Sequence, residues 1–149
     1  MRIQTRYFGE VEVKAEEVLS FSQGLPGFPE ENKFSLLALE ENGLFQVLQS
    51  VNNIDPAFVV VDPFLFVKDY EFKLDDKTKE QLKLHNDEAE LEVKVIVTMK
   101  DSIAKSTANL QAPIIINVKE KLAKQYITNT DYTPREFIFK DSSIAKEEV

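Results

Sequence analysis

Apolar and polar residues alternate along much of this chain with the period of two that is typical of β-strands. Residues 10–14, 91–99 and 137–139 show the pattern most clearly. In the second stretch, Val95 belongs to an apolar stripe, and Lys94 lies on the opposite side. We expect each of these strands to bury one face in a core and to expose the other face to water.

Two further runs, residues 58–61 and 114–116, are continuously apolar and mostly β-branched. This composition favours central strands that are covered on both faces. Asn42-Gly43 is a typical hairpin turn between two apolar runs. The remaining strand candidates are residues 34–39, 45–51, 70–73 and 125–128.

One stretch has clear helical periodicity. Asp75 or Asp76 offers a side chain that caps its N-terminus, and Asn86 is a candidate for its end. Short helical turns are also expected within residues 15–19 and 119–124. The residues that recur every three or four positions in the main helix are Leu74, Thr78, Leu82 and His85.

These elements together predict the fold class. Many short strands, frequent turns and one helix favour a mainly β fold, an antiparallel barrel-like or roll-like single domain with one short helix. We expect the domain to span residues 1–140 and a frayed acidic tail to occupy residues 141–149.

Charge and composition exclude several classes of function. The 149 residues include 18 basic and 26 acidic ones, for a net charge of −8, whereas phosphate contacts need clustered Lys and Arg. No apolar run approaches the ~20 residues of a membrane span, and the first residues do not form a signal peptide. We therefore expect a cytoplasmic location with no membrane or direct nucleic-acid partner. The acidic balance favours a basic protein partner.

The chain offers few groups for catalysis or for holding a cofactor. It has no cysteine and one histidine, His85, so thiol chemistry, zinc clusters and histidine triads lack their residues. Its four glycines form neither a P-loop nor a dinucleotide fingerprint. Asp55, Asp62 and Asp131 leave a carboxylate hydrolase as an alternative, although Asp beside a turn is usually a local backbone acceptor. We expect no cofactor, no metal and no enzymatic activity.

Aromatic and amide side chains in the loops are the candidates for partner contacts. Loop aromatics either plug the ends of a barrel or anchor a protein interface, and both interpretations stay open. Acidic residues near these loops would steer a cationic partner at long range. The candidate contact residues are Phe28, Pro63, Phe64, Tyr70, Asn109 and Asn117, and the candidate steering acids are Asp62, Asp87, Glu88 and Glu90.

Several short motifs follow one another along nearly the whole chain. They are FGEVEV at 8–13, FSQGLPGF at 21–28, FQVLQS at 45–50, AFVVVDP at 57–63 and ANLQAPIIIN at 108–117. This set strongly resembles the family of the flagellar assembly factor FliW. Only the acidic tail lies outside the resemblance.

The resemblance implies a mostly β, barrel-like fold and a regulatory role without enzymatic activity. Proteins of that family bind cytoplasmic flagellin and the RNA-binding translational repressor CsrA, and they act as a switch between these two partners. Flagellin and CsrA are therefore the expected partners of this chain, which we expect to be a monomer when free. The alternative is a generic chaperone-like or scaffold domain with another protein client.

Overall fold

The computed structural model describes residues 1–39, 43–84 and 91–138. Short strands dominate these ranges, with one α-helix, α1 (Asp76–Gln81), and the 3-10 helices η1 (Ala15–Glu17), η2 (Pro63–Leu65) and η4 (Ile103–Lys105). The strands are β1 (Arg2–Thr5), β2 (Gly9–Glu12), β3 (Val18–Ser20), β4 (Lys33–Ala38), β5 (Phe45–Ser50), β6 (Ala57–Val61), β7 (Leu91–Thr98), β8 (Thr107–Ala108), β9 (Ile114–Asn117), β10 (Leu122–Gln125) and β11 (Glu136–Phe137).

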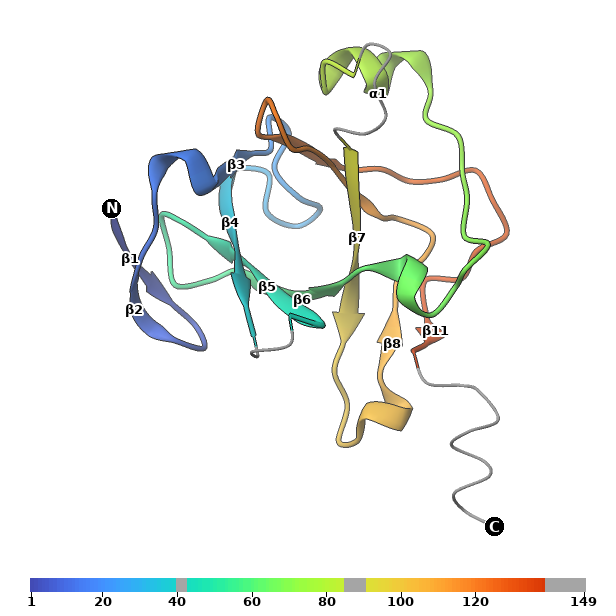
Figure 1. Cartoon of the computed structure of the whole chain (residues 1–149), viewed down its shortest axis with the longest axis horizontal. Coiled ribbons are helices and arrows are strands. Elements are labelled where there is room, and N and C mark those ends of the chain that lie inside the picture. The colour runs from blue at the N-terminus through green and yellow to red at the C-terminus, as the bar shows by residue number, and fades with distance from the viewer. Residues whose placement is uncertain (40–42, 85–90, 139–149) are drawn as a thin grey trace.

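Seven strands close into a barrel in the order β7-β6-β5-β4-β3-β10-β9, and β9 pairs back onto β7 (Figure 1). The neighbours are antiparallel except β3 and β10, which are parallel and meet at one residue pair, Ser20 with Leu122. Strands β8 and β11 extend the sheet from β7, while β1 and β2 form a separate hairpin. The prediction of a mainly β barrel with one short helix is confirmed.

The inside of the barrel is one of two hydrophobic cores. Every barrel strand contributes an apolar side chain to it, as alternation along a barrel strand requires. Phe21 and Phe34 pack edge to face at its centre, with ring centroids 5.1 Å apart. The other buried members are Leu19, Leu25, Leu48, Val60, Ile114, Ile116 and Ala123.

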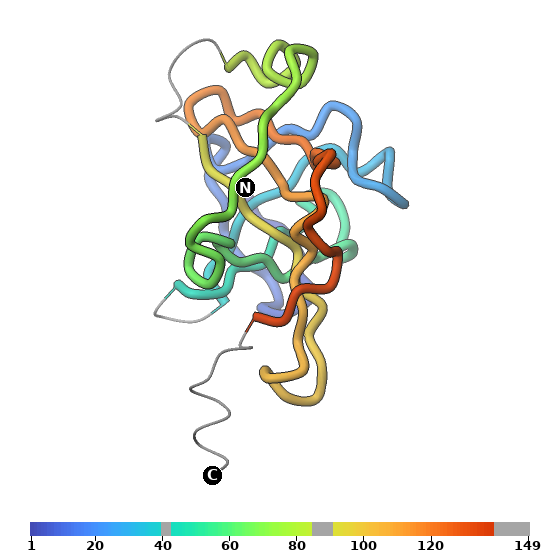
Figure 2. The backbone as a smooth tube through the Cα atoms, turned by 90° about the vertical axis from the view of Figure 1, so that its right-hand side faces the viewer, coloured from blue at the N-terminus to red at the C-terminus, as the bar shows by residue number. Residues whose placement is uncertain are grey.

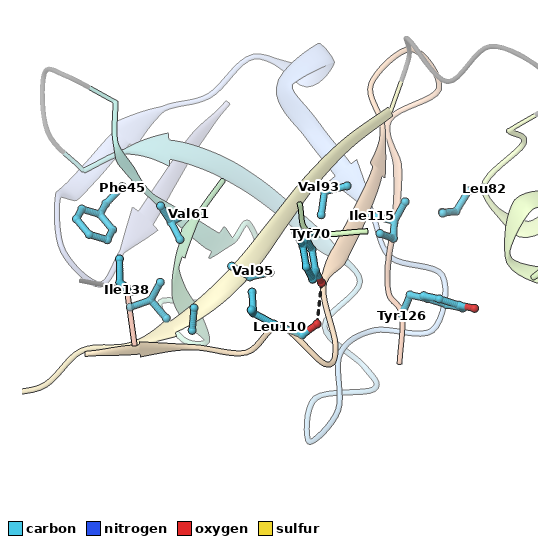
Figure 3. Close-up of a cluster of buried hydrophobic side chains, with 12 residues drawn as sticks. Phe45, Val61, Tyr70, Leu82, Val93, Val95, Leu110, Ile115, Tyr126 and Ile138 are labelled. Atoms are coloured by element: carbon cyan, nitrogen blue, oxygen red, sulfur yellow. Dashed lines mark hydrogen bonds between the residues drawn. The ribbon is translucent and has the colours of Figure 1, made fainter. Parts of the chain in front are cut away.

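The second core lies on the outer face of the barrel, over β5, β6, β7 and β9 (Figure 3). Val93, Val95 and Val97 of β7 form its centre. Residues 62–84 and 126–138 cross this face and contribute the covering side chains, among them Tyr70 and Tyr126. A small barrel therefore gains a second buried layer from its long connections.

The environment of β7 differs from the prediction of one buried and one hydrated face. The valine stripe points outward into the second core, and Ile96 on the opposite side packs against the barrel interior. Glu92 and Thr98, near the two ends, are exposed. The period of two correctly separated the two faces, but both faces are covered because the connections fold over the outside.

The predicted helices are only partly present. Helix α1 is shorter than expected, and Asp75 caps it by accepting a hydrogen bond from the backbone N–H of Thr78 at 2.8 Å. The turn expected within 15–19 is η1. The prediction of a short helical turn within 119–124 is wrong: a turn with Lys121 in the left-handed region (φ 59°) leads directly into β10. His85, Asn86, the Asn42 hairpin position and the tail at 141–149 lie outside the described residues.

Candidate partner-binding surface

An irregular connection, residues 62–75, joins β6 to α1 and is called the strap here. Its residues 70–75 alternate between inward and outward side chains, which explains the strand predicted at 70–73. No strand forms there, because tyrosine hydroxyls take the place of a ladder partner. Tyr132 accepts a hydrogen bond from the backbone N–H of Glu71 at 2.9 Å, and Tyr126 donates to the carbonyl of Lys73 at 3.0 Å.

Tyr70 fixes the strap from the opposite direction. It is 3% exposed, and its hydroxyl donates to the carbonyl of Leu110 at 2.7 Å (Figure 3). Burial, with a smaller contribution from Tyr132, raises the pKa of Tyr70 well above its usual value. The hydroxyl therefore stays protonated and keeps its role as a donor.

Ring contacts continue from Tyr70 to the surface of the strap. Phe64 in η2 packs against Tyr70 with centroids 5.8 Å apart, and Phe72 does so at 5.4 Å. Phe64 and Leu65 remain 44% and 60% exposed. Because the buried ring of Tyr70 supports Phe64 from below, Phe64 has the character of an interface anchor on a fixed base.

The position of η2 itself follows from the local sequence. Asp62 caps the turn by accepting a hydrogen bond from the N–H of Phe64 at 2.9 Å. Pro63 is buried at the first position of the turn, where its missing N–H and fixed φ are favourable. Pro63, Phe64, Tyr70 and the loop after β8 are thus brought together at one place on the barrel.

The amides Asn109 and Asn117 hold turns. Asn109 is half-buried, and its Oδ1 accepts the N–H groups of Gln111 and Ala112, each at 3.1 Å. Asn117 is fully buried and donates to the carbonyl of Leu82 at 2.7 Å. Its burial, like that of Tyr70, leaves no side-chain surface for a partner in this structure. Both amides support loops, and direct contacts by Asn109 stay a prediction.

Phe28 lies in a second exposed region, the loop of residues 22–31. The loop folds back on itself through mutual backbone hydrogen bonds between Leu25 and Phe28. Gly24 (φ 63°) permits this approach, since a Cβ there would lie 2.5 Å from the carbonyl oxygen of Phe28. The Phe28 ring packs edge to face on Phe58 at 6.0 Å and is 40% exposed.

The contact residues predicted from the sequence do not form one surface. Figures 1 and 2 place η2 and the loop of residues 22–31 on separate sides of the barrel. Pro63, Phe64 and Tyr70 belong to the strap, while Phe28 belongs to the loop. Phe72 and Tyr126, which support the strap, were not among the residues predicted from the sequence. Apolar residues recur at every second position around Phe72, and this spacing is the sequence signal that could have identified it.

The acidic candidates divide in a similar way. Asp62 is half-buried as the cap of η2, and Asp131 is exposed. Asp55 forms an ion pair with Arg6 at 3.0 Å. Asp87, Glu88 and Glu90 lie outside the described residues. Hydrogen bonds from Thr78 lower the pKa of Asp75, and the bond from the Thr78 side chain has a larger effect than the bond from its backbone.

Clustered metal ligands and membrane-spanning helices are both lacking among residues 1–39, 43–84 and 91–138. No group of three or more His, Cys, Asp or Glu residues there is arranged to hold a metal ion. No helix among the same residues is long and apolar enough to cross a bilayer.

Fold and surface define a class: a small closed β-barrel whose long connections present exposed aromatic side chains over a second core. The family model described as FliW protein matches residues 2–138. The chain belongs to the FliW family.

Curated relatives and a solved structure agree with this assignment. The flagellar assembly factor FliW of Oceanobacillus iheyensis is 46% identical over 131 residues, covering 88% of each chain. That of Bacillus subtilis is 46% identical over 136 residues, covering 91% of this chain and 94% of the relative. A crystal structure of the flagellar assembly factor FliW superposes with a TM-score of 0.89 at 43% identity, over 95% of this chain and 99% of that one. These relatives bear the name of an assembly factor and not of an enzyme.

Proposed function

We propose that this protein is a cytoplasmic, non-enzymatic regulator of flagellar assembly that switches between flagellin and the RNA-binding translational repressor CsrA. When flagellin accumulates, it occupies the protein and leaves CsrA free to repress flagellin translation. When flagellin is secreted, the freed protein captures CsrA and relieves repression. The observation that carries this proposal is the match to the FliW family over residues 2–138.

The charge of the chain supports a basic partner. The net charge is −8, and a protein that binds RNA must present basic surface to phosphate. Attraction between the two raises the rate of association, and salt weakens it. Asp62, next to the exposed Phe64 of the strap, and the acids Asp87, Glu88 and Glu90 are the proposed steering residues.

The exposed aromatics support a protein interface. Phe28 and Phe64 are the proposed anchors, because each is a large apolar side chain on a loop that is held firmly from below. Asn109 lies near the strap and is a proposed contact, while Tyr70 and Asn117 are proposed to act by holding the loops in place. We expect the free protein to be a monomer.

A competition experiment with purified proteins tests the switch. The full chain is titrated with CsrA by calorimetry, alone and after saturation with monomeric flagellin, at low and at high salt. We expect flagellin to abolish CsrA binding and salt to weaken the CsrA complex. Equal affinity for unrelated unfolded polypeptides would instead identify a generic chaperone-like domain. Unchanged CsrA binding to the flagellin-loaded chain would refute the switch.

Replacement of Phe64 by alanine tests the strap as an interface. The ring is 44% exposed, so we expect the fold to be retained and at least one partner to bind about tenfold more weakly. Ile103→Ala is the matched control, since Ile103 is a similarly exposed apolar residue (45%) in η4. Equal affinities of both variants for both partners would remove Phe64 from the interface.

A further inference from the structure

The barrel has one weakly paired seam, between β3 and β10. On its other edge β10 pairs with β9 along its whole length. That pairing continues beyond the strand, as Tyr126 N–H donates to Pro113 O and Thr128 N–H donates to Gln111 O, each at 2.8 Å. The edge toward β3, in contrast, is paired only at Leu122. The extended segment from 122 to 128 therefore has one complete edge and one largely open edge.

The direction of the backbone groups follows from the ladder. In an antiparallel pair, alternate residues exchange hydrogen bonds with the partner, and the residues between them turn their N–H and C=O groups away. Tyr126 and Thr128 face β9, so the backbone groups of Gln125 and Ile127 face the open edge. Within the described chain, no hydrogen bond to the backbone of either residue is found. The side chain of Ile127 is 66% exposed.

A groove of about 290 Å³ lies directly beside this open edge. One wall is β10, through Ala123–Gln125, and the other is the loop from Ser22 to Pro29. The backbone hydrogen bonds between Leu25 and Phe28 fix the loop wall, so the groove exists before any partner arrives.

The groove differs in charge from the rest of the molecule. Among the described residues that line it, Lys124 alone is charged, and its Nζ donates to Oε1 of Gln81 at 2.6 Å. No carboxylate lines the groove, although the whole chain has 26 acidic residues. An uncharged backbone segment fits these walls better than a basic surface does.

We propose that this groove receives an extended, uncharged segment of flagellin, which adds a strand to the open edge of β10. The added strand hydrogen-bonds to the backbone of Gln125 and Ile127, and its side chains lie against the loop of residues 22–29. Strand addition uses backbone groups that an unfolded segment presents freely and that a folded domain has already paired. Flagellin, which in the proposed function is captured before it is secreted, is the partner proposed to present such a segment, and CsrA is not. This inference rests on the proposed function.

Two substitutions test the site in different ways. Ile127→Pro removes the N–H that faces the open edge, and that N–H has no partner within the described chain, so the pairing with β9 is retained. Ile127→Val retains the N–H and is its matched control. Ser22→Trp fills the groove from the loop wall, and Ser102→Trp places the same side chain on an exposed position beside η4.

Calorimetric titration of the full-length variants with monomeric flagellin gives the first readout. We expect Ile127→Pro and Ser22→Trp to weaken flagellin binding by about tenfold or more, and both controls to bind as the wild type does. Binding of CsrA is expected to remain within about threefold in all four variants. The chain has no tryptophan of its own, so fluorescence of the Ser22→Trp protein also reports whether the groove is covered.

Hydrogen exchange of the wild-type protein gives the second readout and does not depend on any variant. We expect flagellin to slow exchange at the amides of Gln125 and Ile127, and CsrA not to do so. If the wild type fails to bind flagellin at all, the proposed function is wrong. If it binds but these amides exchange unchanged, or if Ser22→Trp binds as tightly as Ser102→Trp, the proposed function stands and the groove is not the site.

Discussion

Replacement of Tyr70 by phenylalanine removes one buried hydroxyl and keeps the ring that packs in the second core. The hydroxyl donates to the carbonyl of Leu110 at 2.7 Å, and the residue is 3% exposed. The variant leaves this carbonyl without its donor in a buried place, which costs about 2 kcal/mol. For a domain of this size, we expect the melting temperature to fall by about 4–8 °C.

The effect of Tyr70→Phe also depends on pH. Because the folded state raises the pKa of Tyr70 above the unfolded value of about 10, its stabilising contribution is complete below pH 10 and is lost as the pH rises further. Above pH 10 the unfolded wild type gains about 1.4 kcal/mol per pH unit from ionisation of this group, and the variant gains nothing from it. The stability difference should therefore shrink between pH 10 and pH 11.

Urea unfolding at neutral pH and at about pH 11 measures both effects. Tyr7→Phe is the control, because Tyr7 is half-exposed and its hydroxyl forms no hydrogen bond among the described residues, so we expect a change within about 0.5 kcal/mol. A loss below about 0.5 kcal/mol for Tyr70→Phe would refute the assigned role of the hydrogen bond. A stability difference that stays constant up to pH 11 would refute the assigned protonation.

Two further substitutions test the loops beside the candidate surfaces. Gly24→Ala should lower the melting temperature strongly, because the new Cβ would lie 2.5 Å from the Phe28 carbonyl oxygen at φ 63°. Gly27→Ala, with φ 87° but open space, should cost only about 1 kcal/mol, and equal losses in thermal unfolding would contradict the clash. Asn117→Ala should cost about 2–3 kcal/mol in urea unfolding by leaving the Leu82 carbonyl unpaired, and a loss near zero would contradict this.

Much of the barrel follows from local sequence rules. Alternation identified β7 and the two faces of its side chains, and the continuous apolar runs identified β6 and β9 as strands covered on both faces. The cap at Asp75 was also predictable, because it needs only a carboxylate next to the first helical turn. The motifs within residues 8–117 indicated the FliW family.

The two failed predictions of secondary structure have different physical causes. Residues 119–124 have helical composition, but the side chain of Asn117 accepts the N–H groups of Lys119 and Glu120 and forms a turn instead. Residues 70–73 have strand alternation, but the neighbours that meet them are the hydroxyls of Tyr126 and Tyr132. The first is a local turn, in which a side chain bonds the backbone two and three residues further on. The second depends on hydroxyls that only the tertiary fold brings to the strap.

The sequence alone determined the class of elements, the positions that face a core and the acidic character of the surface, because periodicity and charge are local properties. The tertiary structure decided which strands close the barrel, that the strap is held by tyrosine hydroxyls, and that the β10 edge stays open beside a groove. These features depend on contacts between residues far apart in the chain. Their cost in chain entropy is repaid only when the whole barrel forms.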